Sequence, residues 1–169
     1  MTDAHEWLIQ WARDAHAMEE QARTMLSGQA QRIENYPELR ARIEQHIQET
    51  DRQAQRLEGY LANIGESEST FKDISGKLMA MGQSFSGIFA GDEVMKGALA
   101  GYTFEHMEIA SYTILMHAAQ TLGDEQLAEI CRQNLEEEKA MAAWLADHMG
   151  ATTAKFLQLE AIGSGAAKR

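Results

Sequence analysis

The chain has 169 residues and 44% of them are hydrophobic, which together indicate one globular domain with a sizeable core. Its formal net charge of -11 argues against nucleic acid or an anionic membrane surface as a partner, because both need a basic face. Cys131 is the single cysteine, so no disulfide can form within the chain. The sequence has no signal peptide and no run apolar enough to span a membrane, so we expect a cytoplasmic protein.

Two long helices are predicted in the first part of the chain. The first runs from about residue 3 to residue 35 and ends before Pro37, because a residue that precedes proline disfavours helix. Pro37 suits the first turn of the second helix, which reaches about Ile64 and stops at Gly65. The connection is a tight turn, so we expect these helices to form an antiparallel pair.

A second pair of long helices is predicted after a long connection. Residues 66 to 90 hold glycines among apolar side chains, and we interpret them as a crossover with its own helix. The third main helix starts after Asp92 and reaches residue 122. Gly123 is then a stop signal, and Asp124 is a good N-cap for the fourth helix.

The order of the connections predicts the topology. The fourth helix should end near Gly150, with a short C-terminal helix from about residue 152 to 161. Short, long and short connections are typical of an all-α, ferritin-like four-helix bundle with one long crossover. We therefore place the bundle at residues 1 to 162 and a flexible tail at residues 163 to 169.

Acidic side chains interrupt the apolar stripes of the four main helices. A helix turns about 100° per residue, so the residues that share a face with the core positions follow from their spacing. Every main helix places at least one carboxylate on or beside its apolar stripe, and the second helix adds a central histidine. These residues are Glu19, His46, Glu49, Glu105, Glu108 and Glu138. The pattern does not decide whether Glu105, at the centre of its stripe, or Glu108, at its edge, is the main candidate on the third helix.

Converging buried carboxylates indicate a metal site. An ionised carboxylate without a partner is costly to bury, and several together repel one another. A divalent cation removes both costs. Carboxylates combined with an imidazole suit iron or manganese, and zinc also accepts such ligands. We therefore predict two iron or manganese ions, with zinc as the alternative.

The spacing follows the pattern of di-metal bundles with two departures. In such bundles two helices each supply a Glu, and the other two each supply Glu-x-x-His. Here the pair on the second helix is reversed, as His46 and Glu49, and Met141 stands where a histidine is expected after Glu138. Tyr112 on the third helix is placed to hydrogen-bond a ligand carboxylate, and Met141 would lie beside the ligands.

A simpler interpretation of each acidic residue remains open. A lone glutamate in an apolar stripe is usually an edge residue with its carboxylate in water, or the partner of a nearby cation. Four basic residues could be such partners: Arg42, Arg52, Arg56 and Lys139. His16 and His106 adjoin the candidate ligands but sit off the stripe centres, so they are additional candidates only.

Several segments resemble the YciE and YciF family of ferritin-like bacterial proteins, and are most similar to its YciE branch. They are RDAHAME at residues 13 to 19, YPELRARIEQH at 36 to 46, FE at 104 to 105, EIA at 108 to 110 followed by Tyr112, and EEK at 137 to 139. The resemblance covers nearly the whole chain. It implies a stress-response protein without an established activity, and a homodimer rather than a hollow storage cage.

Three functions are compatible with these patterns. The first is a di-metal redox or detoxification protein that acts on peroxide, oxygen or iron, like a peroxidase, catalase or ferroxidase. The second is a metal-free helical dimer that binds a partner. The third is a bundle in which the metal only stabilises the fold. The sequence does not decide whether the protein is an enzyme, and it identifies no catalytic residue.

Overall fold

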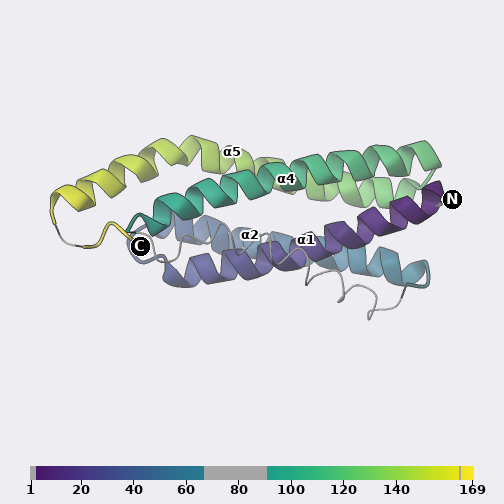
Figure 1. Ribbon diagram of the computed structural model, residues 1–169, viewed down its shortest axis with the longest axis horizontal. Helices are drawn as coiled ribbons and strands as arrows, with labels where there is room; N and C mark the ends of the chain where they lie inside the picture. The colour runs from purple at the N-terminus through teal and green to yellow at the C-terminus, as the bar shows by residue number, and fades with distance from the viewer. Residues whose placement is uncertain (1–2, 67–90, 164) are drawn as a thin grey trace.

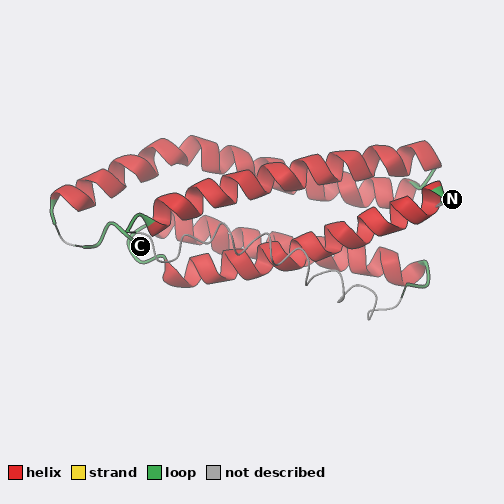
Figure 2. Ribbon diagram, viewed as in Figure 1, coloured by secondary structure: helices red, strands yellow, loops and turns green. Residues whose placement is uncertain are grey.

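The computed structural model describes residues 3 to 66, 91 to 163 and 165 to 169. Four long helices account for most of these residues: α1 (Ala4–Arg32), α2 (Pro37–Asn63), α4 (Glu93–Leu122) and α5 (Glu125–Ala161). Figure 2 shows that helices and loops make up the described chain, which confirms the all-α class. The predicted helix in the crossover falls outside the described residues.

The four helices pack as a bundle of two antiparallel pairs. The tight turns join α1 to α2 and α4 to α5, and the helices lie lengthwise beside one another (Figure 1). α1 packs against α2 and α4, whereas α5 packs against α4 and α2, so each helix has two neighbours. This arrangement confirms the ferritin-like bundle with one long connection between the pairs.

Local signals in the sequence set the helix ends. The side chain of Glu6 accepts a hydrogen bond from the backbone N–H of Asp3 at 3.2 Å and closes the start of α1. Gly123 takes a left-handed backbone with φ 76° and ends α4. Asp124 then caps α5, because its Oδ1 accepts a hydrogen bond from the N–H of Leu127 at 2.9 Å.

The C-terminal part of α5 differs from the prediction. The sequence predicted a break near Gly150 and a separate short helix, but α5 continues unbroken to Ala161. A glycine inside a helix costs only about 1 kcal/mol, which its neighbours offset here. The hydroxyls of Thr152 and Thr153 donate to the carbonyls one turn earlier at 3.0 Å and 2.8 Å. The indole of Trp144 also stacks on the next turn of the same helix.

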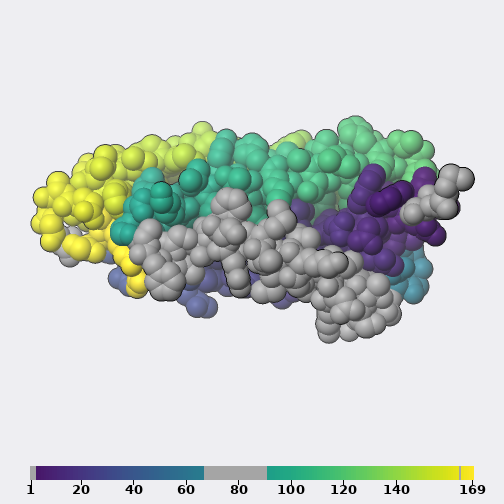
Figure 3. Space-filling view, in the orientation of Figure 1, coloured from purple at the N-terminus to yellow at the C-terminus, as the bar shows by residue number. Residues whose placement is uncertain are grey.

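The last residues are bound to the bundle, whereas the sequence predicted a flexible tail. The hydroxyl of Tyr36 donates to the carbonyl of Ala167 at 2.6 Å, and the N–H of Val94 donates to the carbonyl of Lys168 at 3.0 Å. Figure 3 shows this C-terminal stretch against the start of α4. The tail supplies the acceptor that an uncapped helix start needs, because the side chain of Asp92 makes no cap hydrogen bond.

None of the described helices combines the length and apolarity that a bilayer-spanning segment requires. The core is built mainly from leucine and alanine on the inner faces of all four helices. Within the part of the chain that the structure describes, ten buried residues are polar or charged, and several of them lie together in the middle of the bundle. This polar interior is the feature that calls for a functional explanation.

Candidate metal centre

Four side chains from three helices meet in the core of the bundle. We call them the four-residue cluster: His46 from α2, Glu105 and Glu108 from α4, and Glu138 from α5. Each offers one potential ligand atom, and these atoms all lie within 4.8 Å of one another. Opposite ligands of a six-coordinate divalent ion lie about 4 to 5 Å apart, twice the bond length. The cluster therefore has the dimensions of a site for one ion.

The members of the cluster are completely enclosed. Their exposed fractions are 0% for His46 and Glu138 and 1% for Glu105 and Glu108. The helical repeat explains the convergence, since residues three apart on α4 lie on one face and point at the same part of the core. The sequence predicted all four residues as ligands and placed them on these faces.

Several buried polar atoms of the cluster have no hydrogen-bond partner. Within the described residues, the Nε2 of His46, the Oε2 of Glu105 and both carboxylate oxygens of Glu108 and of Glu138 make no hydrogen bond. The His46 Nε2 lies 3.2 Å from Glu105 and 3.3 Å from Glu138, but these are ion-pair contacts that lack hydrogen-bond alignment. Folded proteins rarely leave so many buried polar groups unsatisfied. Carboxylate oxygens and an imidazole nitrogen are metal ligands, so a bound cation would be the partner that these atoms lack.

Glu49 orients the histidine instead of joining the cluster. Its Oε2 lies 2.7 Å from the Nδ1 of His46, and Arg42 donates to the same oxygen at 3.2 Å. This contact directs the other ring nitrogen, Nε2, into the cluster. A carboxylate on the outer nitrogen of a histidine is the usual support for a metal-binding imidazole. Glu49 was predicted as a ligand, and the structure places it behind the histidine.

The ionisation of this pair follows from its surroundings. Burial alone would lower the pKa of His46, but the carboxylates of Glu105, Glu138 and Glu49 outweigh it and raise that pKa to about 12. Burial would raise the pKa of Glu49, but the His46 imidazole and the Arg42 guanidinium lower it to about 2. Without a metal, His46 is therefore an imidazolium, and it must release a proton before its Nε2 can bind an ion.

The other carboxylates are held in surroundings that oppose their charge. Burial raises the pKa of Glu105 to about 8. Burial, and next the charge of Glu138, raises the pKa of Glu108 well above its usual range. Both effects disfavour the ionised form, and a bound divalent cation would reverse them.

Glu19 lies near the cluster but outside it. It is 0% exposed, and burial, followed by the charge of nearby Glu138, raises the pKa of Glu19 well above its usual range. The Tyr112 hydroxyl donates a hydrogen bond to its Oε1, which is the predicted contact between Tyr112 and a candidate ligand. The other oxygen, Oε2, is buried and has no partner among the described residues.

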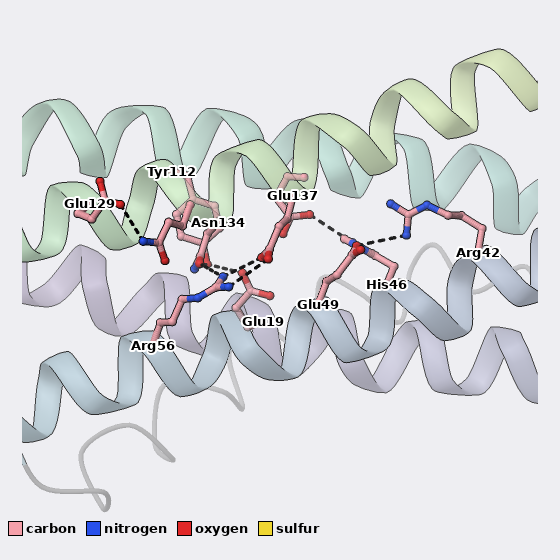
Figure 4. Close-up of polar contacts among 11 residues, drawn as sticks. Glu19, Arg42, His46, Glu49, Arg56, Tyr112, Glu129, Asn134 and Glu137 are labelled. Atoms are coloured by element: carbon pink, nitrogen blue, oxygen red, sulfur yellow. Dashed lines mark hydrogen bonds and ion pairs between the residues drawn. The ribbon is translucent and has the colours of Figure 1, made fainter.

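One residue of this region, Asn134, was missed from the sequence. The side-chain amide of Asn134, which is 0% exposed, donates to the Tyr112 hydroxyl at 3.0 Å. Arg56 donates to the Oδ1 of Asn134 at 2.8 Å and pairs with Glu137 (Figure 4). Asn134 lies one turn before Glu138 on the same face of α5, and that spacing is the signal that could have identified it.

Three of the four basic residues that were considered as partners bind other carboxylates, and the fourth, Arg52, is exposed. Arg42 pairs with Glu49, and Lys139 pairs with Glu136 at the surface. Within the described ranges, no lysine or arginine forms an ion pair with a carboxylate of the four-residue cluster. The simpler interpretation, a cation from the chain itself, therefore does not account for the cluster.

The remaining candidates lie outside the cluster. Met141 is 1% exposed and belongs to the apolar core. His106 is exposed, and its ring makes an edge contact with Tyr102 at a centroid distance of 4.6 Å. Burial lowers the pKa of His16, a half-buried residue on α1.

Comparison with known proteins gives one matching family. Residues 3 to 158 match the model described as a domain of unknown function, DUF892. Among curated relatives, Protein YciF of Escherichia coli is 30% identical over 155 residues, which is 87% of this chain and 90% of that protein. This curated relative and one of the similar solved structures carry the YciF name, so the predicted closeness to the YciE branch is not supported.

Solved structures share the fold. A crystal structure of a Xanthomonas campestris protein superimposes with a TM-score of 0.77 at 38% identity, covering 94% of this chain and 99% of that one. The crystal structure of the E. coli stress protein YciF gives a TM-score of 0.70 at 24% identity, over 87% and 94% of the two chains. The second likeness shows the fold alone.

Proposed function

The chain belongs to the family described as domain of unknown function DUF892, and we propose that it is a metal-binding stress-response protein. The observation that carries this proposal is the four-residue cluster, whose buried carboxylates pair with no lysine or arginine of the described chain and whose ligand atoms lack hydrogen bonds. Three carboxylates and an imidazole suit iron or manganese, and zinc is the alternative. The proposed load is two ions for each chain: the cluster has the dimensions for one, and Glu19 beside it would be a ligand of the other.

The residues of the cluster would hold the metal, and Glu49 would orient its histidine ligand. A bound iron or manganese ion would supply Lewis-acid and redox chemistry toward peroxide, oxygen or iron itself. The core around the cluster excludes water, and a dry site strengthens the attraction between the carboxylates and a cation. The E. coli relative is named a stress protein, which supports a role in the stress response.

The complete burial of the cluster favours a second candidate function. All four members are at most 1% exposed, so an oxidant has to pass through the packed bundle to reach the ion. A metal that only stabilises the fold needs no such access. The two functions differ in turnover. The loaded protein consumes peroxide or oxygen, or oxidises Fe²⁺, only if the first is correct.

Metal binding is tested by exchanging one central ligand. Glu105→Ala should lose bound metal, measured by mass spectrometry on protein purified without a metal-affinity tag. Glu136→Ala is the matched control, because Glu136 is an exposed carboxylate that pairs with Lys139. Full metal content in the Glu105→Ala protein would remove Glu105 from the ligand set and the cluster from consideration as the site.

We also propose that the protein is cytoplasmic and that it is a homodimer, as its family resemblance implies. Exposed apolar side chains near the end of α5 support an interface, since Leu157 and Ile162 are 60% and 74% exposed. Light scattering coupled to size exclusion should give twice the chain mass of 18.9 kDa, and a single-chain mass would contradict the proposal.

A further inference from the structure

A cavity lies between the start of α2 and the C-terminal part of α5. α5 has 37 residues and α2 has 27, because α5 continues through Gly150 whereas α2 begins at Pro37. Figure 1 shows the end of α5 extending past the other described helices. A space of about 220 Å³ lies where α5 passes the first turn of α2. We call it the α2–α5 cavity, and its lining includes Tyr36, Leu39, Trp144, His148, Thr152 and Lys155.

An aromatic ring at the start of α2 forms one wall of the cavity. Tyr36 is 3% exposed, and its hydroxyl donates to the carbonyl of Ala167 at 2.6 Å. The ammonium of Lys155 lies 5.3 Å from the centre of the Tyr36 ring, within the range of a cation–π contact. The tail thus holds the ring, and the ring holds the lysine, so both are in place before a ligand binds.

A stacked pair of rings on α5 lines the same cavity. The rings of Trp144 and His148 are nearly parallel, with centroids 3.8 Å apart and an angle of 12° between them. The Nδ1 of His148 lies 2.8 Å from the carbonyl oxygen of Trp144. A carbonyl only accepts, so Nδ1 carries a hydrogen and Nε2 keeps its capacity to bond. The stack therefore supplies a flat apolar surface with one polar nitrogen at its edge.

Lys155 brings a positive charge that no carboxylate balances within the described residues. There, the lysines that pair with carboxylates are Lys96 and Lys139. Glu38 is the acidic residue of the lining, and it is exposed, so water and salt screen its charge. In a chain with a net charge of -11, an unpaired cation beside an aromatic cavity favours an anionic ligand.

The size and the polar groups of the cavity limit the class of ligand. Sites for drug-sized molecules usually measure roughly 300 to 1,000 Å³, so this cavity suits a smaller molecule. Its aromatic walls favour a flat ring. One ammonium and one imidazole nitrogen suit a carboxylate, whereas a phosphate group is usually held by several cationic donors.

We propose that the α2–α5 cavity binds a small aromatic carboxylate, with the ring of the ligand against Trp144 and its carboxylate paired with Lys155. The site is separate from the four-residue cluster. Leu39 in the cavity precedes His46 by two turns of α2, which is about 10 Å along the helix axis. The inference therefore does not depend on whether the cluster binds metal.

The test is a titration of ¹⁵N-labelled protein with benzoate, followed by the nuclear magnetic resonance signals of the three indole N–H groups. The signal of Trp144, identified by its loss in Trp144→Leu, should shift with a dissociation constant of about 1 mM, as expected for a ligand of so few atoms. The signals of Trp7 and Trp11 on α1 should not move. Benzyl alcohol lacks the charge and should bind more weakly, and benzylamine should bind more weakly still.

Replacing the lysine separates the role of its charge from that of the aromatic walls. Lys155→Gln should weaken benzoate binding about two- to fivefold, as expected for a partly exposed ion pair, and should leave benzyl alcohol binding unchanged. Lys139→Gln is the matched control on the same helix, because Lys139 pairs with Glu136 at the surface. Followed on the resonances of the probes, Trp144→Leu should weaken both, whereas Trp7→Leu should weaken neither.

Three results would each overturn the inference: a Trp144 signal that benzoate does not move, equal affinity for benzoate in Lys155→Gln and wild type, or tighter binding of benzylamine than of benzoate. A Trp144 signal that moves with protein concentration and not with benzoate would also contradict it, because a second copy of the chain would then occupy the cavity. Glu105→Ala should bind benzoate like wild type, so failure of the metal site would leave this result standing.

Discussion

Buried carboxylates in two regions of this bundle have their negative charge balanced in different ways. Glu93 at the start of α4 is 7% exposed, and its two oxygens pair with Arg32 at 2.5 Å and Arg169 at 3.2 Å. The carboxylates of the four-residue cluster are more deeply buried and have only His46 as a cationic contact among the described residues. Among the described residues, arginines thus pair with the buried carboxylate at one end of the bundle, whereas none pairs with the carboxylates of the cluster.

The difference shows which kind of partner the central region lacks. Burying a charge is tolerable when the protein provides the opposite charge together with hydrogen bonds, as around Glu93. At the centre, one imidazolium faces several carboxylates, and the unpartnered oxygens remain. A cation taken from solution is the partner that fits both the deficit of charge and the 4.8 Å spacing of the ligand atoms.

The largest effect is expected when the carboxylate that orients His46 is replaced. Glu49→Gln should weaken metal binding by about 10- to 100-fold, because the neutral amide holds the His46 ring less firmly in the orientation that points Nε2 into the cluster. Calorimetric titration with Mn²⁺ measures the change. Glu44→Gln is the control on the same helix, since Glu44 is exposed and pairs with Arg40. Equal affinities in the two variants would show that Glu49 does not act on the site.

Breaking the arginine-paired region should affect stability without affecting metal. Glu93→Gln leaves Arg32 and Arg169 without their charged partner. Because these side chains are 31% and 41% exposed, solvent screening limits the loss to about 1 to 2 kcal/mol of unfolding free energy. Denaturant unfolding measures that loss. A fall in Mn²⁺ affinity in this variant would contradict the independence of the two regions.

A histidine in place of Met141 should add a metal ligand to the central region. Met141→His places an imidazole one turn after Glu138, where a ferritin-like bundle has its second histidine ligand. We expect iron to bind about fivefold more tightly, close to 1 kcal/mol, in an Fe²⁺ titration without oxygen. Unchanged affinity, in a variant that folds like wild type, would mean that residue 141 does not face the ions.

The smallest expected effect is a gain in the stability of the metal-free protein. Glu108→Gln should raise its stability by up to about 1 kcal/mol, because a neutral amide replaces a buried carboxylate that has no hydrogen-bond partner. The same change should weaken metal binding. Melting curves with chelator present measure the first effect. A metal-free Glu108→Gln protein less stable than wild type would show that the carboxylate has a partner within the chain.

Much of the fold followed from the sequence because its signals are local. Pro37, Gly123 and Asp124 mark helix ends through backbone conformation and capping, and the structure confirms each of them. Gly150 misled the prediction, since the cost of a glycine is small beside the packing and hydrogen bonds around it. The bound tail was missed because it depends on Asn35, Tyr36 and Glu93, which are distant in sequence.

The candidate site was predictable only in part. Helical periodicity places Glu105, Glu108 and Glu138 on inner faces, and the bundle topology then brings those faces together. Periodicity fixes the direction of a side chain but not its reach along the bundle axis. For that reason it did not separate Glu49, which lies behind His46, from residues that enter the cluster. The contact of Asn134 with Tyr112 likewise needed coordinates.

The central claim is that a divalent cation completes the four-residue cluster. Its most direct test is the melting temperature of tag-free, metal-stripped protein before and after Mn²⁺ is added at 100 times its dissociation constant. Binding to the folded state alone contributes about 2.7 kcal/mol at that concentration, which raises the melting temperature by about 5 to 10 °C in a protein of this size. An unchanged melting temperature, with no Mn²⁺ retained by the protein, would contradict the claim.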